Sequence, residues 1–232
     1  MKIKYGMILA AGLGKRMLPL TLTTPKPLIK IKDISLLERS INLLVVFGIQ
    51  EISINVHHLP EQIKDFINQK KFKVKIHISD ESDLLLDTGG GVAAGTKHFG
   101  NEPFIVMNPD TLWNNNYLGE VEELEALYQR NQKPSLLVVD RSQSFDQSFK
   151  GDFNLEGNRI SRNSENRFIF TGLQITSKKY FISQNSKIFS MTKIWNDLIK
   201  NQNLLGLESK KRFFHLNTFE MFKKISDLKI TD

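Results

Sequence analysis

The sequence predicts an α/β protein in which a mixed, mostly parallel sheet lies between two layers of helices, an α/β/α arrangement. Apolar, strand-like segments alternate with helical segments over the first 140 residues, which is typical of a parallel sheet covered on both faces. After about residue 140 the pattern changes to a hairpin and a longer strand. This change predicts a small antiparallel addition to the sheet, with a lid over the sheet edge.

The first part of the chain is expected to supply most of the sheet. Segments that are apolar, or that alternate between apolar and polar residues, predict strands at 3–10, 51–56, 72–79, 103–108 and 134–140. Helical apolar spacing predicts connecting helices at 34–48, 60–69, 89–99 and 118–131. The first of these stops at Gly48, and the second opens with Pro60. The third segment begins with a turn of three glycines that leads into the helix.

The remainder of the chain is expected to complete the same domain. A hairpin is predicted at 151–162, a strand at 167–176, and helices at 191–201 and 218–228. The sequence contains no linker, internal repeat or low-complexity tract. We therefore expect a single domain over 1–232, made of two halves, 1–140 and 141–232.

Composition and charge exclude several classes of protein. No apolar run reaches the roughly 18 residues of a membrane span, and the N-terminal segment is strand-like and too short for a signal peptide, so no membrane partner and a cytoplasmic location are expected. The chain has 0 cysteines, which excludes disulfides and thiolate chemistry. The net charge is +7, but the lysines are spread along the chain, which favours small phosphorylated substrates over nucleic acid.

The stretch MILAAGLGKRMLPLTLTTPKPL, residues 7–28, follows the first strand at the edge where ligands of such sheets lie. It lacks the third glycine of a dinucleotide fingerprint, its prolines prevent an immediate long helix, and it does not fit the Walker A spacing. What remains is a glycine turn whose backbone N–H groups can hold phosphate, with Arg16 and Lys26 as cations. Prolines on both sides limit where Lys26 can point; the alternative is a solvated surface loop.

Two further motifs suit the same ligand edge. Asp110 follows a buried strand in FIVMNPDTLW, where its carboxylate can hold Mg²⁺, although an Asx-type turn would also place an aspartate there. In LLDTGGGVAAG, three glycines before a helix permit close backbone approach to a base or a sugar, unless the turn is purely structural. No second histidine lies at zinc spacing from His57 and His58, so no transition-metal site is expected there.

Residues 9–28 resemble the signature of the sugar-1-phosphate nucleotidyltransferases, roughly L-A-A-G-x-G-x-R-(x)-x-P-L-T-x-x-x-P-K-P-L/M. The match is nearly complete over about twenty residues. Later segments resemble later parts of the same family, in order: NVHHLPEQI, ISDESDLLLDTGGGV, NPDTLW, GDF, FTGLQI and RFFHLNTFE. The resemblance covers essentially the whole chain and is closest to the short, single-domain branch of N-acetylmuramate-1-phosphate uridylyltransferases and mannose-1-phosphate guanylyltransferases.

The resemblance implies a Rossmann-like fold with a nucleotide-binding half, 1–140, and a sugar-binding and C-terminal half, 141–232. It implies attack by a sugar-1-phosphate oxygen on the α-phosphorus of a nucleoside triphosphate, with loss of pyrophosphate. Arg16, Lys26 and Asp110 would be catalytic, with Asp110 holding Mg²⁺. The implied nucleotide-binding residues are Ala10, Ala11, Gly12, Gly14, Arg16, Lys26, Gln62, Thr88, Gly89 and Gly90. The implied sugar-binding residues are Asn108, Asp152, Thr171 and Gly172.

The C-terminal motif departs from the family pattern. Many members carry W-x-D-x-G-T, whose aspartate is the second metal ligand, but here the segment reads FFHLNT, with His215 at the aspartate position and Asn217 at the glycine position. His215 could ligate the metal, which suits Mn²⁺ better than Mg²⁺, or it could pair with a phosphate as an imidazolium. The departure also keeps open a regulatory subunit that binds nucleotide without turnover.

The expected function is uridylyl transfer from UTP to N-acetylmuramate 1-phosphate, which serves cell-wall (peptidoglycan) recycling. The alternative is guanylyl transfer from GTP to mannose 1-phosphate, and no single residue of the sequence decides between them. The expected cofactor is Mg²⁺, with Mn²⁺ as the other ion to test. A monomer or small homo-oligomer is expected, with no nucleic acid partner.

Overall fold

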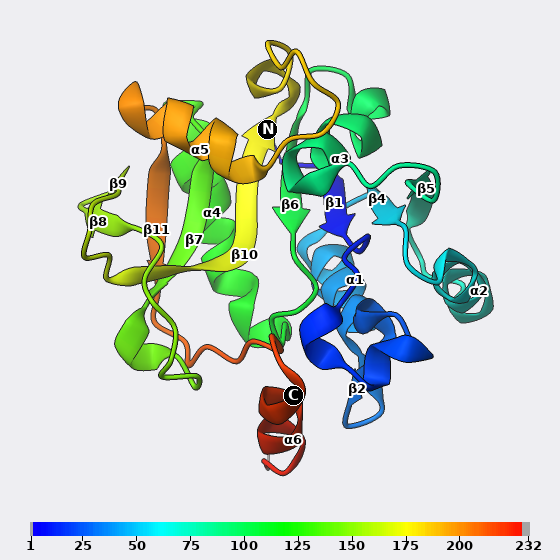
Figure 1. Cartoon of the computed structure of the whole chain (residues 1–232). Coiled ribbons are helices and arrows are strands. Elements are labelled where there is room, and N and C mark those ends of the chain that lie inside the picture. The colour runs from blue at the N-terminus through cyan, green and yellow to red at the C-terminus, as the bar shows by residue number, and fades with distance from the viewer. Residues whose placement is uncertain (1, 229–232) are drawn as a thin grey trace.

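The computed structural model describes residues 2–228, and within them nine strands form one sheet in the order β5-β4-β1-β6-β10-β7-β11-β9-β8 (Figure 1). The strands are β1 (Tyr5–Leu9), β4 (Glu51–Val56), β5 (Lys75–Asp80), β6 (Pro103–Met107), β7 (Ser135–Asp140), β8 (Asn154–Glu156), β9 (Arg159–Ser161), β10 (Phe168–Ser177) and β11 (Leu205–Ser209). Strands from both halves of the sequence therefore share one continuous sheet.

The direction of the strands makes the sheet mixed and mostly parallel. β5, β4, β1 and β6 are parallel neighbours, and β7 is parallel to β11. β10 runs antiparallel to both β6 and β7, so these two blocks point the same way. The carboxyl ends of the parallel strands consequently meet along one edge of the sheet, as the predicted fold class requires.

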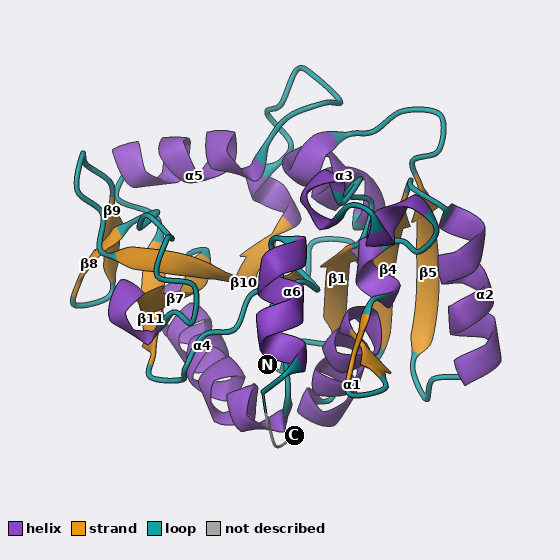
Figure 2. Cartoon of the chain, turned by 60° about the horizontal axis from the view of Figure 1, so that its bottom comes forward, coloured by secondary structure: helices purple, strands orange, loops and turns teal. Residues whose placement is uncertain are grey.

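Helices cover both faces, which gives the three predicted layers (Figure 2). The apolar residues of α1 (Leu36–Phe47), α2 (Pro60–Lys70) and α4 (Leu118–Asn131) pack in one cluster, and those of α3 (Asp87–Gly95) and α5 (Met191–Lys200) pack in another. The short α6 (Phe219–Ser226) packs instead against the hairpin of β2 (Lys30–Ile31) and β3 (Ile34–Ser35). Within the described residues, no helix is long and apolar enough to cross a membrane.

Short 3₁₀ helices occupy many of the connections. They are η1 (Lys15–Met17), η2 (Leu20–Leu22), η3 (Lys26–Leu28), η4 (Lys97–Phe99), η5 (Asn115–Tyr117), η6 (Arg141–Gln143) and η7 (Lys178–Tyr180). The first three follow one another in the proline-containing stretch after β1. The prolines therefore break this stretch into single turns, in agreement with the expectation that no long helix begins there.

The longer strand of the second half, β10, lies in the interior of the sheet, where nearly all of its residues are buried. One local prediction was wrong. The three glycines 89–91 do not form a turn but lie within the first turns of α3. Tight packing explains them: a Cβ at Gly90 would lie 2.2 Å from the carbonyl oxygen of Lys187.

Candidate active site

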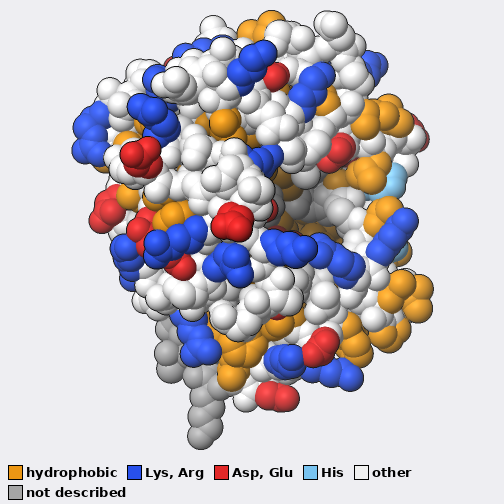
Figure 3. Space-filling view, turned by 60° about the vertical axis from the view of Figure 1, so that its left-hand side comes forward, with side chains coloured by type: hydrophobic (Ala, Val, Ile, Leu, Met, Phe, Trp, Pro, Cys, Tyr) orange, Lys and Arg blue, Asp and Glu red, His pale blue; other side chains and the backbone are white. Residues whose placement is uncertain are grey.

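A pocket of about 600 Å³ lies at the carboxyl ends of β1, β4 and β6. Figure 3 shows a hollow in this face of the molecule, with Lys and Arg side chains beside it. Its size falls in the range of small-molecule sites, roughly 300–1,000 Å³. The predicted residues that line it are Ala10, Ala11, Gly12, Gly14, Arg16, Lys26, Thr88, Asn108 and Asp110.

The first wall of the pocket is the loop that leaves β1. Gly14 adopts a left-handed conformation with φ of 62° and begins η1. Its carbonyl accepts a hydrogen bond of 3.0 Å from the Thr21 hydroxyl, and a Cβ at this position would lie 2.8 Å from Cγ2 of Thr21. Only glycine fits this close turn without strain. Gly12, in contrast, has open space around it.

Two buried polar residues, Asn55 and Glu81, fix this loop through hydrogen bonds, and sequence reasoning missed both. Oδ1 of Asn55 accepts the Ala10 backbone N–H at 2.8 Å, and its amide group donates to Glu81 at 2.7 Å. The other Glu81 oxygen accepts the N–H of Leu86 at 2.9 Å. Asn55 and Glu81 both line the pocket. Their positions near the carboxyl ends of predicted strands, Asn55 within β4 and Glu81 directly after β5, were the signal that could have identified them. They tie the β1 loop to the segment before α3.

The second wall carries Asp110, which forms a charged pair with Lys26 at the end of the first wall. Nζ of Lys26 lies 2.7 Å from Oδ2 of Asp110, so a residue of η3 reaches across the pocket to the loop after β6. Burial raises the pKa of Asp110, but the charges of His215 and Lys26 outweigh it and hold that pKa well below its usual value. The carboxylate is therefore ionised throughout the physiological range.

The C-terminal segment joins this wall through a short antiparallel bridge. Leu112 donates its N–H to the Phe214 carbonyl at 2.9 Å, and Leu216 donates to the Asp110 carbonyl at 2.7 Å. The bridge places Nε2 of His215 3.5 Å from Oδ2 of Asp110. Burial lowers the pKa of His215, and the charges of Lys26 and Arg16 lower it further. The charge of Asp110 raises this pKa but does not outweigh them. The imidazole is therefore neutral at pH 7.

The donor set of this wall fits a divalent cation. Within the described residues, Oδ1 of Asp110 and Oδ1 of Asn217 are buried without a hydrogen-bond partner, and both residues line the pocket. A buried carboxylate oxygen without a partner is costly unless a ligand satisfies it. Asn217, which the motif comparison treated only as a missing glycine, thus presents a second buried oxygen without a partner in the pocket lining.

Three predicted nucleotide-binding residues lie outside the pocket lining. Gln62 is exposed, and its amide donates to the Thr23 carbonyl at 2.9 Å, where it braces the first wall. Gly89 and Gly90 are buried against the segment that contains Phe189 and Lys187. A direct contact of these residues with the nucleotide stays a prediction.

The predicted sugar-binding residues are grouped behind Asn108. The Asn108 N–H donates to the Gly172 carbonyl at 2.7 Å, at the bulge of β10. The Thr171 hydroxyl donates to the Leu137 carbonyl at 2.8 Å, and Asp152 accepts the Phe170 N–H at 2.9 Å. Burial raises the pKa of Asp152. The hydrogen bond from Phe170 and the charge of Arg162 lower it, but by less. Of this group only Asn108 lines the pocket, and the sugar-binding roles stay predictions.

Comparison with known proteins identifies the family of the chain. The family model described as "Nucleotidyl transferase" matches residues 5–144. An N-acetylmuramate alpha-1-phosphate uridylyltransferase of Neisseria meningitidis serogroup B is 34% identical over 75% of this chain and 76% of its own length. The corresponding protein of Caulobacter vibrioides is 25% identical over 92% of this chain and 91% of its own length. A mannose-1-phosphate guanyltransferase of Hypocrea jecorina is 35% identical, but over 46% of this chain and 30% of its own length.

Solved structures share the fold at low sequence identity. A UDP-glucose pyrophosphorylase complexed with UDP-glucose superposes with a TM-score of 0.79 at 18% identity, covering 97% of both chains. The UDP-glucose pyrophosphorylase of Acinetobacter baumanii gives 0.79 at 17% identity, covering 97% of this chain and 92% of its own. The fold and the family match define a nucleotidyltransferase. More particularly, the chain belongs to the sugar-1-phosphate nucleotidyltransferases.

Proposed function

We propose that the protein transfers the uridylyl group of UTP to N-acetylmuramate 1-phosphate and releases pyrophosphate. The observation that carries this choice is the share of each relative's length that aligns with this chain. The two uridylyltransferase relatives align over 91% and 76% of their own lengths, whereas the mannose-1-phosphate guanyltransferase of Hypocrea jecorina aligns over 30%. The product would be a nucleotide sugar for cell-wall recycling, made in the cytoplasm, where UTP is available.

The proposed reaction uses the two walls in different ways. A phosphate oxygen of the sugar phosphate attacks the α-phosphorus of UTP, and the bond from that phosphorus to the bridging oxygen breaks as pyrophosphate leaves. The backbone of Ala10–Gly14 lies along the nucleotide, Arg16 stabilises the charge on the departing pyrophosphate, and Lys26 contacts the reacting phosphates. Such chemistry depends on positioning and charge neutralisation, which fixed cations supply.

The second wall would hold Mg²⁺ in this proposal. Asp110, Asn217 and His215 are the residues to bind it, since the first two present buried oxygens without partners and the imidazole of the third is neutral. The ion would neutralise charge on the phosphates and orient them. Lys26, which pairs with Asp110 at 2.7 Å, is then placed to exchange that contact for a substrate phosphate.

The remaining predicted contacts follow the same division. Thr88 lies in the pocket lining beside the first wall and is proposed to contact the nucleotide, with Gly89, Gly90 and Gln62 supporting that side. Asn108 is proposed to meet the sugar, held by Gly172, with Thr171 and Asp152 behind it.

A pyrophosphate-release assay tests the proposal. The purified protein is tested with each of four nucleoside triphosphates against a panel of sugar 1-phosphates that includes N-acetylmuramate, glucose and mannose. We expect UTP with N-acetylmuramate 1-phosphate to give the highest kcat/KM. A higher value for GTP with mannose 1-phosphate would replace the proposal with the guanylyltransferase alternative. Binding of a nucleotide without release for any pair would instead identify a regulatory subunit.

A further inference from the structure

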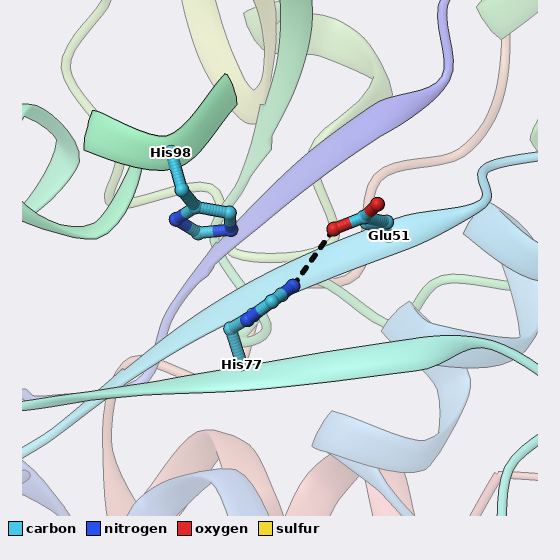
Figure 4. A group of neighbouring side chains, drawn as sticks. All are labelled: Glu51, His77 and His98. Atoms are coloured by element: carbon cyan, nitrogen blue, oxygen red, sulfur yellow. Dashed lines mark hydrogen bonds and ion pairs between the residues drawn. The ribbon is translucent and has the colours of Figure 1, made fainter. Parts of the chain in front are cut away.

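Three side chains that can bind a metal converge at the edge of the sheet opposite the pocket (Figure 4). Glu51 is the first residue of β4, His77 lies on the neighbouring strand β5, and His98 lies in η4 after α3. The pocket lies at the other ends of these elements, where Asn55 and Thr88 line it. The cluster is therefore separate from the candidate active site.

The cluster is already close to the dimensions of a metal centre. One ligand atom from each side chain lies within 4.8 Å of the other two. Nε2 of His77 lies 2.8 Å from Oε2 of Glu51, and the rings of His77 and His98 are 4.1 Å apart between centroids. Tetrahedral zinc with bonds of about 2.0–2.1 Å separates its ligand atoms by about 3.3 Å. The ligand atoms, which lie within 4.8 Å of one another, therefore need only small side-chain shifts to reach that geometry.

We propose that Glu51, His77 and His98 bind a divalent transition-metal ion, with Zn²⁺ as the best fit. Two imidazoles and one carboxylate are ligands that zinc accepts, and His98 is exposed, which leaves a fourth position open to water. The chain has 0 cysteines and 5 histidines, so imidazole is the nitrogen or thiolate ligand that this sequence can offer to zinc, and the cluster contains two of these histidines.

The surroundings of Glu51 and His98 lower the pKa of both side chains. Hydrogen bonds from His77 and then Lys75 lower the pKa of Glu51, so its carboxylate is ionised at neutral pH. Burial and the neighbouring His77 lower the pKa of His98, which leaves a lone pair on its ring at pH 7. The two histidines that follow β4 have other partners, because ring nitrogens of His57 and His58 each lie 2.7 Å from a backbone carbonyl oxygen.

Lys75 is the internal competitor of the ion. Its ammonium lies 3.2 Å from Oε2 of Glu51, the same oxygen that contacts His77. The Lys75 side chain is 63% exposed, so it can turn into solvent when an ion replaces it. Without metal, the cluster is a hydrogen-bonded ion pair at the sheet edge; with metal, it becomes a cross-link between β4, β5 and η4.

This cross-link has a structural consequence. β5 is the edge strand of the sheet, and η4 follows directly on α3, whose first turn carries Asp87 and Thr88 in the pocket lining. An ion bound by the native state alone stabilises it by mass action. We therefore expect Zn²⁺ to raise the midpoint of thermal unfolding, independently of any substrate.

Zinc titration of the untagged full-length protein tests the proposal. Calorimetry is carried out in excess Mg²⁺, which occupies oxygen-rich sites and competes poorly for imidazole. We expect one Zn²⁺ per chain at this cluster, and a visible d–d absorption spectrum with Co²⁺. His77→Ala and Glu51→Gln should each weaken binding at least about tenfold, since even the outer partners of metal ligands contribute about 10–100-fold.

Two matched variants separate a metal site from a packing cluster. His98→Phe keeps a ring against Phe99 and His77 but removes the ring nitrogens, so it should lose zinc affinity while the metal-free melting temperature stays near that of the parent. Lys75→Met removes the competing cation and should tighten binding. His215→Ala, which alters the second wall of the pocket and not the cluster, should leave zinc affinity at the cluster unchanged.

The proposal is overturned by either of two results. One is a parent protein that shows no Zn²⁺-dependent heat or thermal shift in the micromolar range. The other is a parent that binds zinc with an affinity that His77→Ala and His98→Phe leave unchanged, which would place the ion elsewhere.

Discussion

The two walls of the pocket are built in opposite ways. The first, from Ala10 to Lys26, is one continuous stretch whose shape comes from a left-handed glycine, single 3₁₀ turns and prolines. The second brings together two segments that are distant in sequence: 104 residues separate Thr111 from His215, which face each other in the bridge.

The difference shows which kind of site tolerates change. A continuous loop keeps its motif only if each residue fits its local conformation, so its sequence pattern is preserved and recognisable. An assembled wall needs only suitable donors at the point where two segments meet, and here it presents histidine and asparagine, His215 and Asn217. The predictions below test whether the two walls divide the chemistry as proposed.

Asp110→Asn should have the largest effect. The change keeps the size of the side chain but removes the charge that pairs with Lys26 and is proposed to hold Mg²⁺. We expect kcat to fall at least about 10³-fold, since removing one preorganised electrostatic partner already costs about 10²–10³-fold. Pyrophosphate release measures the loss, and circular dichroism checks that the fold is intact. Full activity of this variant would place the metal elsewhere, with Asp87 and Asp152 the next residues to test.

Arg16→Ala should reduce turnover more than nucleotide binding. Arg16 is exposed and lines the first wall, where charge develops on the leaving pyrophosphate. We expect a loss of about 10²-fold in kcat with little change in the Kd for the nucleotide. Lys73→Ala removes the same charge from an exposed position before β5 and serves as the control. If the two variants behave alike, Arg16 is a surface cation.

His215→Ala should cost about tenfold in kcat, and His215→Asp should keep activity with Mg²⁺ because it restores an oxygen ligand. The pKa of His215 is lowered, so its imidazole is neutral at pH 7 and above, and activity should not fall as pH rises from 7 to 8. Rates measured with Mg²⁺ and Mn²⁺ at several pH values test this. A fall in activity with rising pH, together with a loss in His215→Asp, would assign His215 to a phosphate as an imidazolium.

Gly14→Ala and Gly12→Ala form a matched pair on the first wall. Gly14 is left-handed, and a Cβ there would lie 3.2 Å from Cβ of Lys26, so the alanine variant should lose about 1–2 kcal/mol of stability, or about 2–8 °C in Tm. Gly12 has open space, so its variant should melt like the parent yet weaken nucleotide binding if the ligand approaches this backbone. Equal melting temperatures for both variants would contradict the description of the loop.

Much of the fold follows from local pattern. The helix at 34–48 was predicted because its apolar residues recur at helical spacing, and α1 ends at Gly48, which has a φ of 106°. The helix at 118–131 has the predicted bounds in the structure. The strand at 167–176 was predicted and forms β10, but its position between β6 and β7 was not predicted, because a buried apolar strand has the same pattern at any interior position of a sheet. The strands β2 and β3 were missed because two residues each carry no periodic signal. β11 was missed because its sequence LGLES contains a glycine and only two large apolar residues.

The sequence by itself determined the class of protein and the first wall of the site, because a glycine turn with fixed cations and prolines is specified by neighbouring residues. Only the tertiary structure decided what stands opposite that loop. Asn55 on β4 and Glu81 after β5 support it, Asn217 and Asp110 each present a buried oxygen without a partner, and Glu51, His77 and His98 meet from three separate elements. The physical reason is that hydrogen bonds and ligand sets depend on distance in space, and sheet pairing brings together residues whose separation along the chain carries no such signal.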